Sequence, residues 1–273
     1  GYVRKNAIVD IVDKIEAEQQ GQLPIPAMAA IAPFAEVGKV AVAIGHLNAN
    51  PDLDGAIRSE PLVLSFYDQY YPSLSLQIAA QYLNLKPQDI KVRLGEGLVL
   101  GKLNIATDSA LQMNTFFYSD KDGKAPFVAD SFYDVLSGKI STEKYKDKIV
   151  LIGMAATGDG SDNQITPISS HMKPIETLAH SVASILNEDF FVMPAWAIWG
   201  QLSAWLLVAM YLSVLLPRLG VGRAAMTTLS FFAVLVAMHL WLMTQKGLWL
   251  PLMMPVALLV VGHAVLTTKR FFL

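Results

Sequence analysis

The chain has 273 residues, a formal net charge of −2 and no cysteine, and 53% of its residues are hydrophobic. The near-neutral charge argues against the strongly basic surface with which proteins bind nucleic acid. The absence of cysteine excludes a small secreted scaffold held by disulfides. It fits an exported domain of the bacterial periplasm that is large enough to bury its own core.

The N-terminal part of the chain predicts short helices followed by a buried strand. Residues 6–20 have the apolar spacing of an amphipathic helix, and a second short helix is expected over 27–34. The apolar run 39–45 predicts a buried strand. Residues 56–67 are expected to return beside it, because an Asp-Gly step between apolar runs favours a hairpin.

The middle of the chain continues this alternation. A helix is predicted from Pro72, because proline suits the first helical position. Residues 90–118 predict three or four short strands, and Ser131 predicts the cap of a helix that ends at Gly138. The run 149–152 is entirely apolar, which is typical of a central strand covered on both faces.

The helix predicted over 176–186 completes the domain. Strands interspersed with helices predict an α/β (α+β) fold with a mixed sheet and helices on its faces. We place this water-soluble domain at residues 1–193.

Three apolar stretches predict membrane spans in the last third of the chain. They cover about 196–216, 224–244 and 248–268, and none contains Asp, Glu, Lys or Arg. Each reaches the roughly 20 residues that a helix needs to cross the hydrocarbon core of a bilayer. Helices are expected because every backbone group in lipid must be satisfied internally. Residues 194–273 are therefore predicted to form a transmembrane domain.

Basic residues at the ends of these spans predict the orientation. Arg218 and Arg223 follow the first span, and Lys269 and Arg270 follow the third. Basic residues favour the cytoplasmic side, so residues 1–193 are expected in the periplasm and the C-terminus in the cytoplasm. The predicted protein is multi-pass in the bacterial inner membrane. Tryptophans suited to the lipid headgroup level fall on the predicted outer side: Trp196, Trp199, Trp241 and Trp249.

A periplasmic domain must be exported, and the chain opens on Gly1 without an initiator methionine or a signal peptide. We therefore expect further residues upstream, including a membrane span. The end of the chain at Leu273 leads us to expect a cytoplasmic part beyond it.

Several motifs occur in a characteristic order over about residues 23–192. They are His46-Leu47-Asn48, residues 51–62, 71–76, 134–138 and 147–153, Asp162 with Thr166-Pro167, and Glu176 with the helix to Leu186. Together they resemble the type-two CHASE domain, an extracellular sensor of bacterial cyclases and kinases. In that family three membrane helices follow the sensor, and a cyclase or kinase domain usually follows the last helix. Leu178 stands where members commonly carry a histidine.

The resemblance implies the sensory input module of a bacterial transmembrane receptor. Such a module would couple a periplasmic ligand or envelope protein to a nucleotide cyclase, histidine kinase or Ser/Thr kinase. It also implies a homodimer, because these outputs work as dimers. The alternative is a non-catalytic structural or scaffolding membrane protein whose periplasmic domain binds an envelope protein. We expect no catalytic residues and no cofactor, since Gly-x-Ser-x-Gly and cysteine nucleophiles are missing.

Asp52, Asp54 and Arg58 form the most distinctive polar group of the first domain. One interpretation makes them ligand contacts in a sensor pocket. In the other, the acids shape a turn through hydrogen bonds to the backbone while Arg58 pairs with one of them. A calcium loop is excluded, because Gly55 comes too early and no bidentate glutamate follows at the required spacing.

Asp162 and Glu176 are the other candidate ligand-binding residues. Asp162 ends a glycine-rich loop after the apolar run 149–152, but the loop lacks the Gly-Lys-Ser/Thr ending of a phosphate-binding loop. Its two aspartates, Asp159 and Asp162, would also repel phosphate, so nucleotide binding is not expected.

Histidines do not predict a metal site. The histidines of the first domain lack the spacing of zinc ligands, and none pairs with a cysteine. His239 and His263 fall inside predicted spans, where we expect neutral imidazoles that bond across helices.

Overall fold

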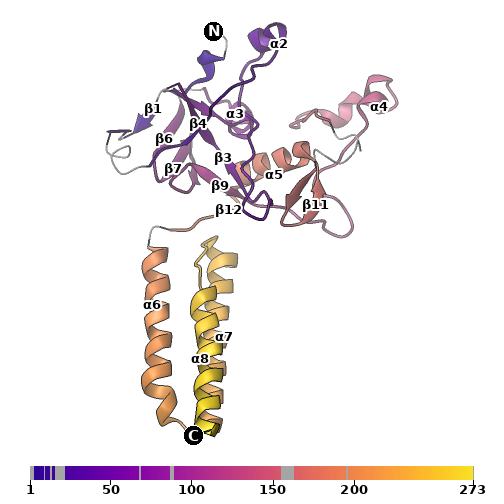
Figure 1. Cartoon of the computed structure of the whole chain (residues 1–273). Helices are drawn as coiled ribbons and strands as arrows, with labels where there is room; N and C mark the ends of the chain where they lie inside the picture. Colours follow the sequence, from indigo (N-terminus) through magenta and orange to yellow (C-terminus); the bar gives the residue numbers. More distant parts are fainter. Residues whose placement is uncertain are drawn as a thin grey trace. The chain divides into compact units, whose positions relative to one another are not determined.

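The computed structural model describes residues 3–8, 10–12, 14–15, 22–67, 69–86, 89–154, 163–194 and 196–272. The chain divides into two compact units, Gly1–Phe190 and Phe191–Leu273 (Figure 1). Sheets and short helices make up the first unit, and long helices make up the second.

The largest sheet of the first unit has four strands in the order β1-β6-β7-β8. In it, β1 (Asp10–Val12) pairs parallel with β6 (Ile90–Arg93), while β7 (Gly97–Leu100) and β8 (Leu103–Ala106) continue antiparallel. Alternate residues of β6 are buried, so one face of this sheet lies against the core.

Three smaller sheets complete the described strands of this unit. Their members are β2 (Ile25–Pro26), β4 (Val63–Phe66) and β5 (Gln69–Pro72); β3 (Ser59–Pro61), β9 (Gln112–Thr115) and β12 (Phe190–Phe191); and the hairpin β10 (Gln164–Thr166) and β11 (Ser169–Met172). Parallel and antiparallel pairings both occur, which confirms a mixed α/β arrangement. The described residues form several small sheets rather than the single mixed sheet that was predicted.

Two predicted helices are confirmed and pack against each other, α3 (Leu74–Tyr82) and α5 (Pro174–Asn187). The first begins where the Ser73 hydroxyl accepts the N–H of Leu76 at 3.2 Å. The second begins with a proline and ends at Glu188, whose backbone is left-handed. They share a core with the sheets that includes Leu62, Leu76, Ile90, Leu98, Leu100, Leu111, Met113 and Ile185.

Shorter helical pieces complete the unit: η1 (Arg4–Asn6), α2 (Ala35–Val40), α4 (Phe132–Leu136) and η3 (Thr142–Tyr145). The cap predicted at Ser131 is confirmed, because its hydroxyl accepts the N–H of Asp134. Within the helix predicted over 6–20, residues 10–12 instead pair with β6 as a strand, whereas residues 14 and 15 are helical as predicted. Residues 9, 13 and 16–20 lie outside the described part. The helix predicted over 27–34 starts instead at Ala35, because a residue before a proline, here Ala32, is pushed out of the helical region.

Two apolar runs do not form the strands that their sequences predict. The first two residues of the run 39–45 belong to the last turn of α2, and Val42 is 83% exposed. Residues 149–152 join no sheet, and Ile152 is 74% exposed. An apolar run becomes a strand only when a neighbouring strand takes up its backbone hydrogen bonds, and no described segment does so here. The hairpin predicted with 56–67 is therefore also wrong; β3 and β4 pair with β9 and β5 instead.

Gly45 allows a close contact between residues 44–46 and the first turn of α3. The N–H of Leu74 donates to the carbonyl of His46 at 2.8 Å, and the N–H of His46 donates to Pro72 at 3.1 Å. A Cβ at residue 45 would lie 2.4 Å from the Leu74 nitrogen. Only a residue without a side chain permits this approach of two backbones.

The second unit is helical: α6 (Ala197–Met210), a π-helical turn η4 (Tyr211–Leu215), a 3₁₀ turn η5 (Leu216–Arg218), α7 (Val221–Lys246) and α8 (Met253–Phe272). Two helical segments, Ala197–Arg218 and Val221–Gln245, are long and apolar enough to cross a membrane (Figure 1). They coincide with the first two predicted spans.

The third predicted span differs from the structure at its start. Residues 248–252 precede α8 as a non-helical segment that contains Pro251, and the apolar part of the helix covers Met253–Lys269. This helix is shorter than the two spans, so a third crossing remains a prediction. Both α6 and α7 pack against α8.

Replacing Gly45 by alanine should destabilise the first unit by about 1–3 kcal/mol, because the new Cβ meets backbone atoms that cannot move aside. The measurement is the urea midpoint of the chain in detergent, followed by tyrosine fluorescence. Ala41→Ser, at an exposed position nearby, is the control. Equal midpoints for the two variants would contradict the close contact.

Candidate functional site

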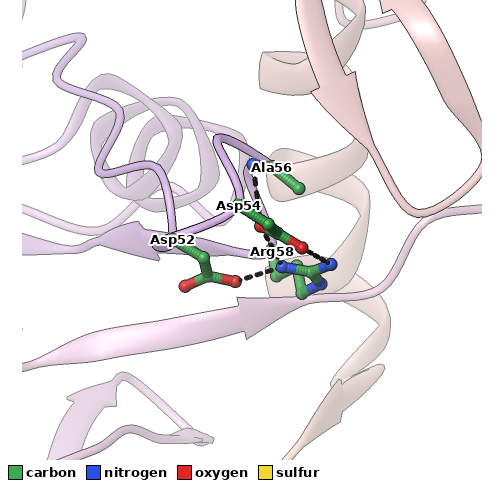
Figure 2. Close-up of polar contacts among 4 residues, drawn as sticks. All are labelled: Asp52, Asp54, Ala56 and Arg58. Carbon is green, nitrogen blue, oxygen red and sulfur yellow. Dashed lines mark hydrogen bonds and ion pairs between the residues drawn. The ribbon is translucent and has the colours of Figure 1, made fainter.

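Asp52, Asp54 and Arg58 contact one another at the turn before β3. Figure 2 shows the Arg58 guanidinium between the two carboxylates. Its Nη1 donates to Asp52 Oδ2 at 2.6 Å and to Asp54 Oδ1 at 2.9 Å, and its Nη2 donates to Asp54 Oδ2 at 2.7 Å. The pairing with Asp54 is bidentate, the arrangement for which the planar guanidinium is suited.

The same carboxylate shapes the turn. Asp54 Oδ1 also accepts the N–H of Ala56 at 3.1 Å, as Figure 2 shows. The N–H of Asp52 donates to the carbonyl of Ala56 at 2.9 Å, and Gly55 has the left-handed φ of +79° that this turn requires. The turn-shaping interpretation is thus the one that the hydrogen bonds of these residues match.

Arg58 sets the charge state of the turn. The hydrogen bonds from its guanidinium, followed by that from Ala56, lower the pKa of Asp54 to about 2. The two acids in turn raise the pKa of Arg58. The three side chains together carry one formal net negative charge and are exposed. A ligand that approaches from solvent would therefore encounter side chains whose ion pairs are already formed.

The turn is attached to the strands on either side of it. The N–H of Ile57 donates to the carbonyl of Ile165 in β10 at 2.7 Å. The carbonyl of Arg58 accepts the N–H of Thr115 in β9 at 3.0 Å. A shift of the turn would therefore strain its hydrogen bonds to both β9 and β10.

Glu176 lies in the first turn of α5 and serves as its cap. Its Oε2 accepts the backbone N–H of Lys173 at 3.0 Å. The Lys173 ammonium donates to Asn163 Oδ1 at 2.6 Å, and the Thr177 hydroxyl donates to Gln164 Oε1 at 2.6 Å. The start of α5 is thus bonded to the hairpin that also holds the 52–58 turn. Asp162, the remaining candidate, lies outside the described residues, as does the glycine-rich loop before it.

The described side chains do not assemble a metal site. Within the ranges that the structure covers, no three His, Asp or Glu side chains lie close enough to hold an ion.

A buried carboxyl group, Glu60 on β3, was missed by the sequence interpretation. Its Oε1 accepts the Ser75 hydroxyl at 2.7 Å, and Ser75 bonds the Ser73 hydroxyl at 2.8 Å. Burial raises the pKa of Glu60, opposed by hydrogen bonds from Ser181, Ser75 and Ser73. Its Oε2 is buried and has no hydrogen-bond partner among the described residues. A carboxyl group held in this way favours the protonated form.

This group joins three elements. Glu60 comes from β3, Ser73 and Ser75 from the start of α3, and Ser181 from α5, where it lies 3.3 Å from the Thr115 hydroxyl of β9. The sequence signal is faint, because a glutamate in a three-residue strand is ordinarily exposed. Only the packing of α3 on α5 shows that this one is covered.

His46 is the second partly hidden titratable group. Its Nδ1 accepts the N–H of Asn48 at 3.4 Å, and its buried Nε2 has no partner among the residues described. Burial lowers the pKa of His46 to about 4. The neutral ring is favoured in the folded state, so His46 contributes stability above its ordinary pKa that is lost as pH falls toward 4.

His180 on α5 is enclosed by rings. Its imidazole lies 4.9 Å from Phe127 and 5.2 Å from Phe117, and it stacks on Tyr118 at 6.0 Å. Its Nδ1 accepts the N–H of Tyr118 at 3.1 Å. Burial lowers the pKa of His180, and the ring acts here as a packed acceptor.

A comparison with protein families found a match over most of the chain. The family model of the CHASE2 domain covers residues 5–216, more than three quarters of the chain. The match extends beyond the region of resemblance at both ends and includes α6. Searches of curated proteins and of solved structures gave no match.

Arg58→Ala should move the pKa of Asp54 from about 2 toward its ordinary 3.8, because the guanidinium donors are the largest cause of the lowering. The parent turn should lose stability as pH falls from 3.8 through 2, and the variant should not. NMR titration of the Asp54 carboxyl carbon measures this pKa in the parent and in the variant. Arg93→Ala, which removes an exposed arginine 4.0 Å from Glu96, is the control; an Asp54 pKa still near 2 in Arg58→Ala would contradict the assignment.

Glu60→Gln should stabilise the first unit at alkaline pH. A carboxyl whose folded pKa is raised loses its stabilising effect as pH rises through that pKa, whereas the amide stays neutral. The urea midpoint of the variant should exceed that of the parent at about pH 8 and approach it at about pH 4. Glu96→Gln, an exposed matched change, should alter neither midpoint. A lower midpoint for Glu60→Gln at both pH values would show that the carboxylate form is the one required.

Proposed function

Because the chain belongs to the CHASE2 domain family, whose members are extracellular sensory domains, we propose that it is the sensory input module of a bacterial transmembrane signalling receptor. It couples a periplasmic ligand or protein partner to a cytoplasmic nucleotide cyclase, histidine kinase or Ser/Thr kinase outside these residues. The observation that carries the proposal is the extent of the match, which covers residues 5–216 and so reaches from the first unit into the first apolar segment.

The proposed topology places residues 1–193 and the loop between α7 and α8 in the periplasm, and the C-terminus in the cytoplasm. The basic residues Arg218 and Arg223 between the first two spans support it. So does the pairing of Val192 with that loop: its N–H donates to Gly247 at 2.8 Å, and Trp249 donates back to its carbonyl at 2.9 Å. The start of the first span and the end of the second therefore lie at the same end of the second unit.

The proposed mechanism is a population shift. The 52–58 turn bonds β10, β10 bonds the start of α5, and residues 188–196 connect α5 to α6. A ligand that binds one arrangement of these elements more tightly would bias the helices that follow. A homodimer would deliver this bias to an output that works as a pair of subunits.

Single cysteines in this cysteine-free chain test the topology. Lys121→Cys and Gln245→Cys should react with a membrane-impermeant maleimide on intact spheroplasts, and Gly220→Cys only after permeabilisation. Labelling of Lys121→Cys that also requires permeabilisation would place the first unit in the cytoplasm and rule out the receptor.

Sensory coupling is tested by joining the chain after α8 to a cyclase domain that is active only as a dimer. Glu60→Gln alters a buried group of the first unit and should change cyclic-nucleotide output by about fivefold, the lower end of allosteric couplings. Glu96→Gln should leave the output at the parent level. An active fusion whose output ignores every change in the first unit would favour the scaffolding alternative.

A further inference from the structure

Three polar side chains connect the helices of the second unit. The Tyr211 hydroxyl in η4 lies 2.6 Å from the Thr228 hydroxyl in α7, and Thr228 lies 2.8 Å from Nδ1 of His263 in α8. Tyr211 also lies 3.3 Å from the carbonyl of Ala224, one turn earlier in α7. The prediction that His263 bonds across helices is confirmed, whereas the buried His239 Nδ1 has no partner among the residues described.

Other hydroxyls of these helices behave differently. Ser213, Thr227, Thr244 and Thr267 each lie within hydrogen-bond distance of the carbonyl four residues earlier in their own helix, at 2.6–2.8 Å. These four hydroxyls donate to backbone carbonyls of their own helix and do not connect one helix to another. The chain Tyr211–Thr228–His263 instead uses its hydroxyls between helices.

The backbone is unusual where this hydrogen-bond chain begins. Tyr211 is the first residue of the π-helical turn, which passes into a 3₁₀ turn containing Pro217. Single π-turns within α-helices are rare and occur frequently at functional sites. The adjacent Leu212 packs against Gly262, where a Cβ would lie 2.4 Å from the Leu212 Cδ1. The glycine lets α8 approach the π-turn closely beside His263.

The hydrogen-bond chain has two possible directions. When His263 Nδ1 is unprotonated, Thr228 donates to it and Tyr211 donates to Thr228. When Nδ1 carries the proton, it donates to Thr228, Thr228 donates to Tyr211, and Tyr211 donates to the Ala224 carbonyl. The proton position on His263 and the bonding of Tyr211 are therefore linked through one hydroxyl.

We propose that the Tyr211–Thr228–His263 chain is a polar clamp that couples the π-turn after α6 to α8. This inference rests on the proposed function, in which α6 follows the sensor and α8 leads to the output. A movement that rotates or shifts α6 separates Tyr211 from Thr228 and leaves polar groups unpaired in an apolar surrounding. Such groups find a new partner only if the other helices move too.

Cross-linking tests the clamp without reference to signalling. The chain has no cysteine, and Leu212→Cys with Gly262→Cys would place two thiols at the contact between η4 and α8. In this paired background, Tyr211→Phe, Thr228→Val and His263→Phe each remove one polar group with little change in size. Each should change the rate of disulfide formation in membranes by about threefold or more. Thr267→Val and Ser213→Ala, which remove local hydroxyls, are the matched controls.

The Tyr211→Phe/His263→Phe double variant separates the clamp from simple packing. The two changes break the same hydrogen-bond chain, so their combined effect should be smaller than the product of the single effects. Effects that multiply, or rates equal to those of the Thr267→Val control, would overturn the clamp.

The cyclase fusion tests the coupling role. Clamp variants should make the output insensitive to Glu60→Gln, while Thr267→Val should preserve its effect. If clamp variants alter cross-linking but leave that effect intact, the coupling role is wrong. If neither Glu60→Gln nor any other change in the first unit alters the output of the parent fusion, the sensory function fails, and cross-linking still decides whether the clamp exists.

Discussion

Helix α5 connects the separate parts of the first unit through hydrogen bonds that its side chains make. The Ser184 hydroxyl accepts the N–H of Phe116 at 2.9 Å, and His180 Nδ1 accepts that of Tyr118. These backbone groups follow β9 and are partly buried, where an N–H group needs a hydrogen-bond partner. At the other end of the helix, Thr177 bonds the β10–β11 hairpin. Because α5 also packs on α3, a shift of this one helix would disturb every sheet that contacts it.

This arrangement gives the exposed 52–58 turn a physical link to the chain that leads to the second unit. The ion pairs of Arg58 are exposed and contribute little to stability. Their value lies in fixing the turn, whose neighbour Ile57 bonds Ile165 in β10. The buried Glu60 group ties β3 to the start of α3 and to the middle of α5. The surface turn and the buried carboxyl thus act on the same helix.

Local signals predicted what local interactions determine. The cap at Ser131 and the helices α3 and α5 follow from residues a few positions apart. The 52–58 turn likewise follows from an Asp-Gly step with acids around it. The runs 39–45 and 149–152 look like strands in sequence, but a strand depends on a partner that periodicity cannot name. Glu60 was missed for the same reason, since its burial comes from helices distant in sequence.

The second unit shows the same limit more sharply. Thr227 and Thr228 are neighbours with the same side chain, yet Thr227 bonds the Arg223 carbonyl of its own helix and Thr228 bonds Tyr211 and His263. Successive residues of an α-helix point about 100° apart, so the rotation of α7 alone decides which threonine faces its neighbours. Apolar composition predicts that such helices form, because lipid leaves the backbone no other partner. It does not fix their rotation. That rotation is set by the few polar groups that have to meet, and the three joined here would resist any turn of α7 that exchanged Thr228 for Thr227.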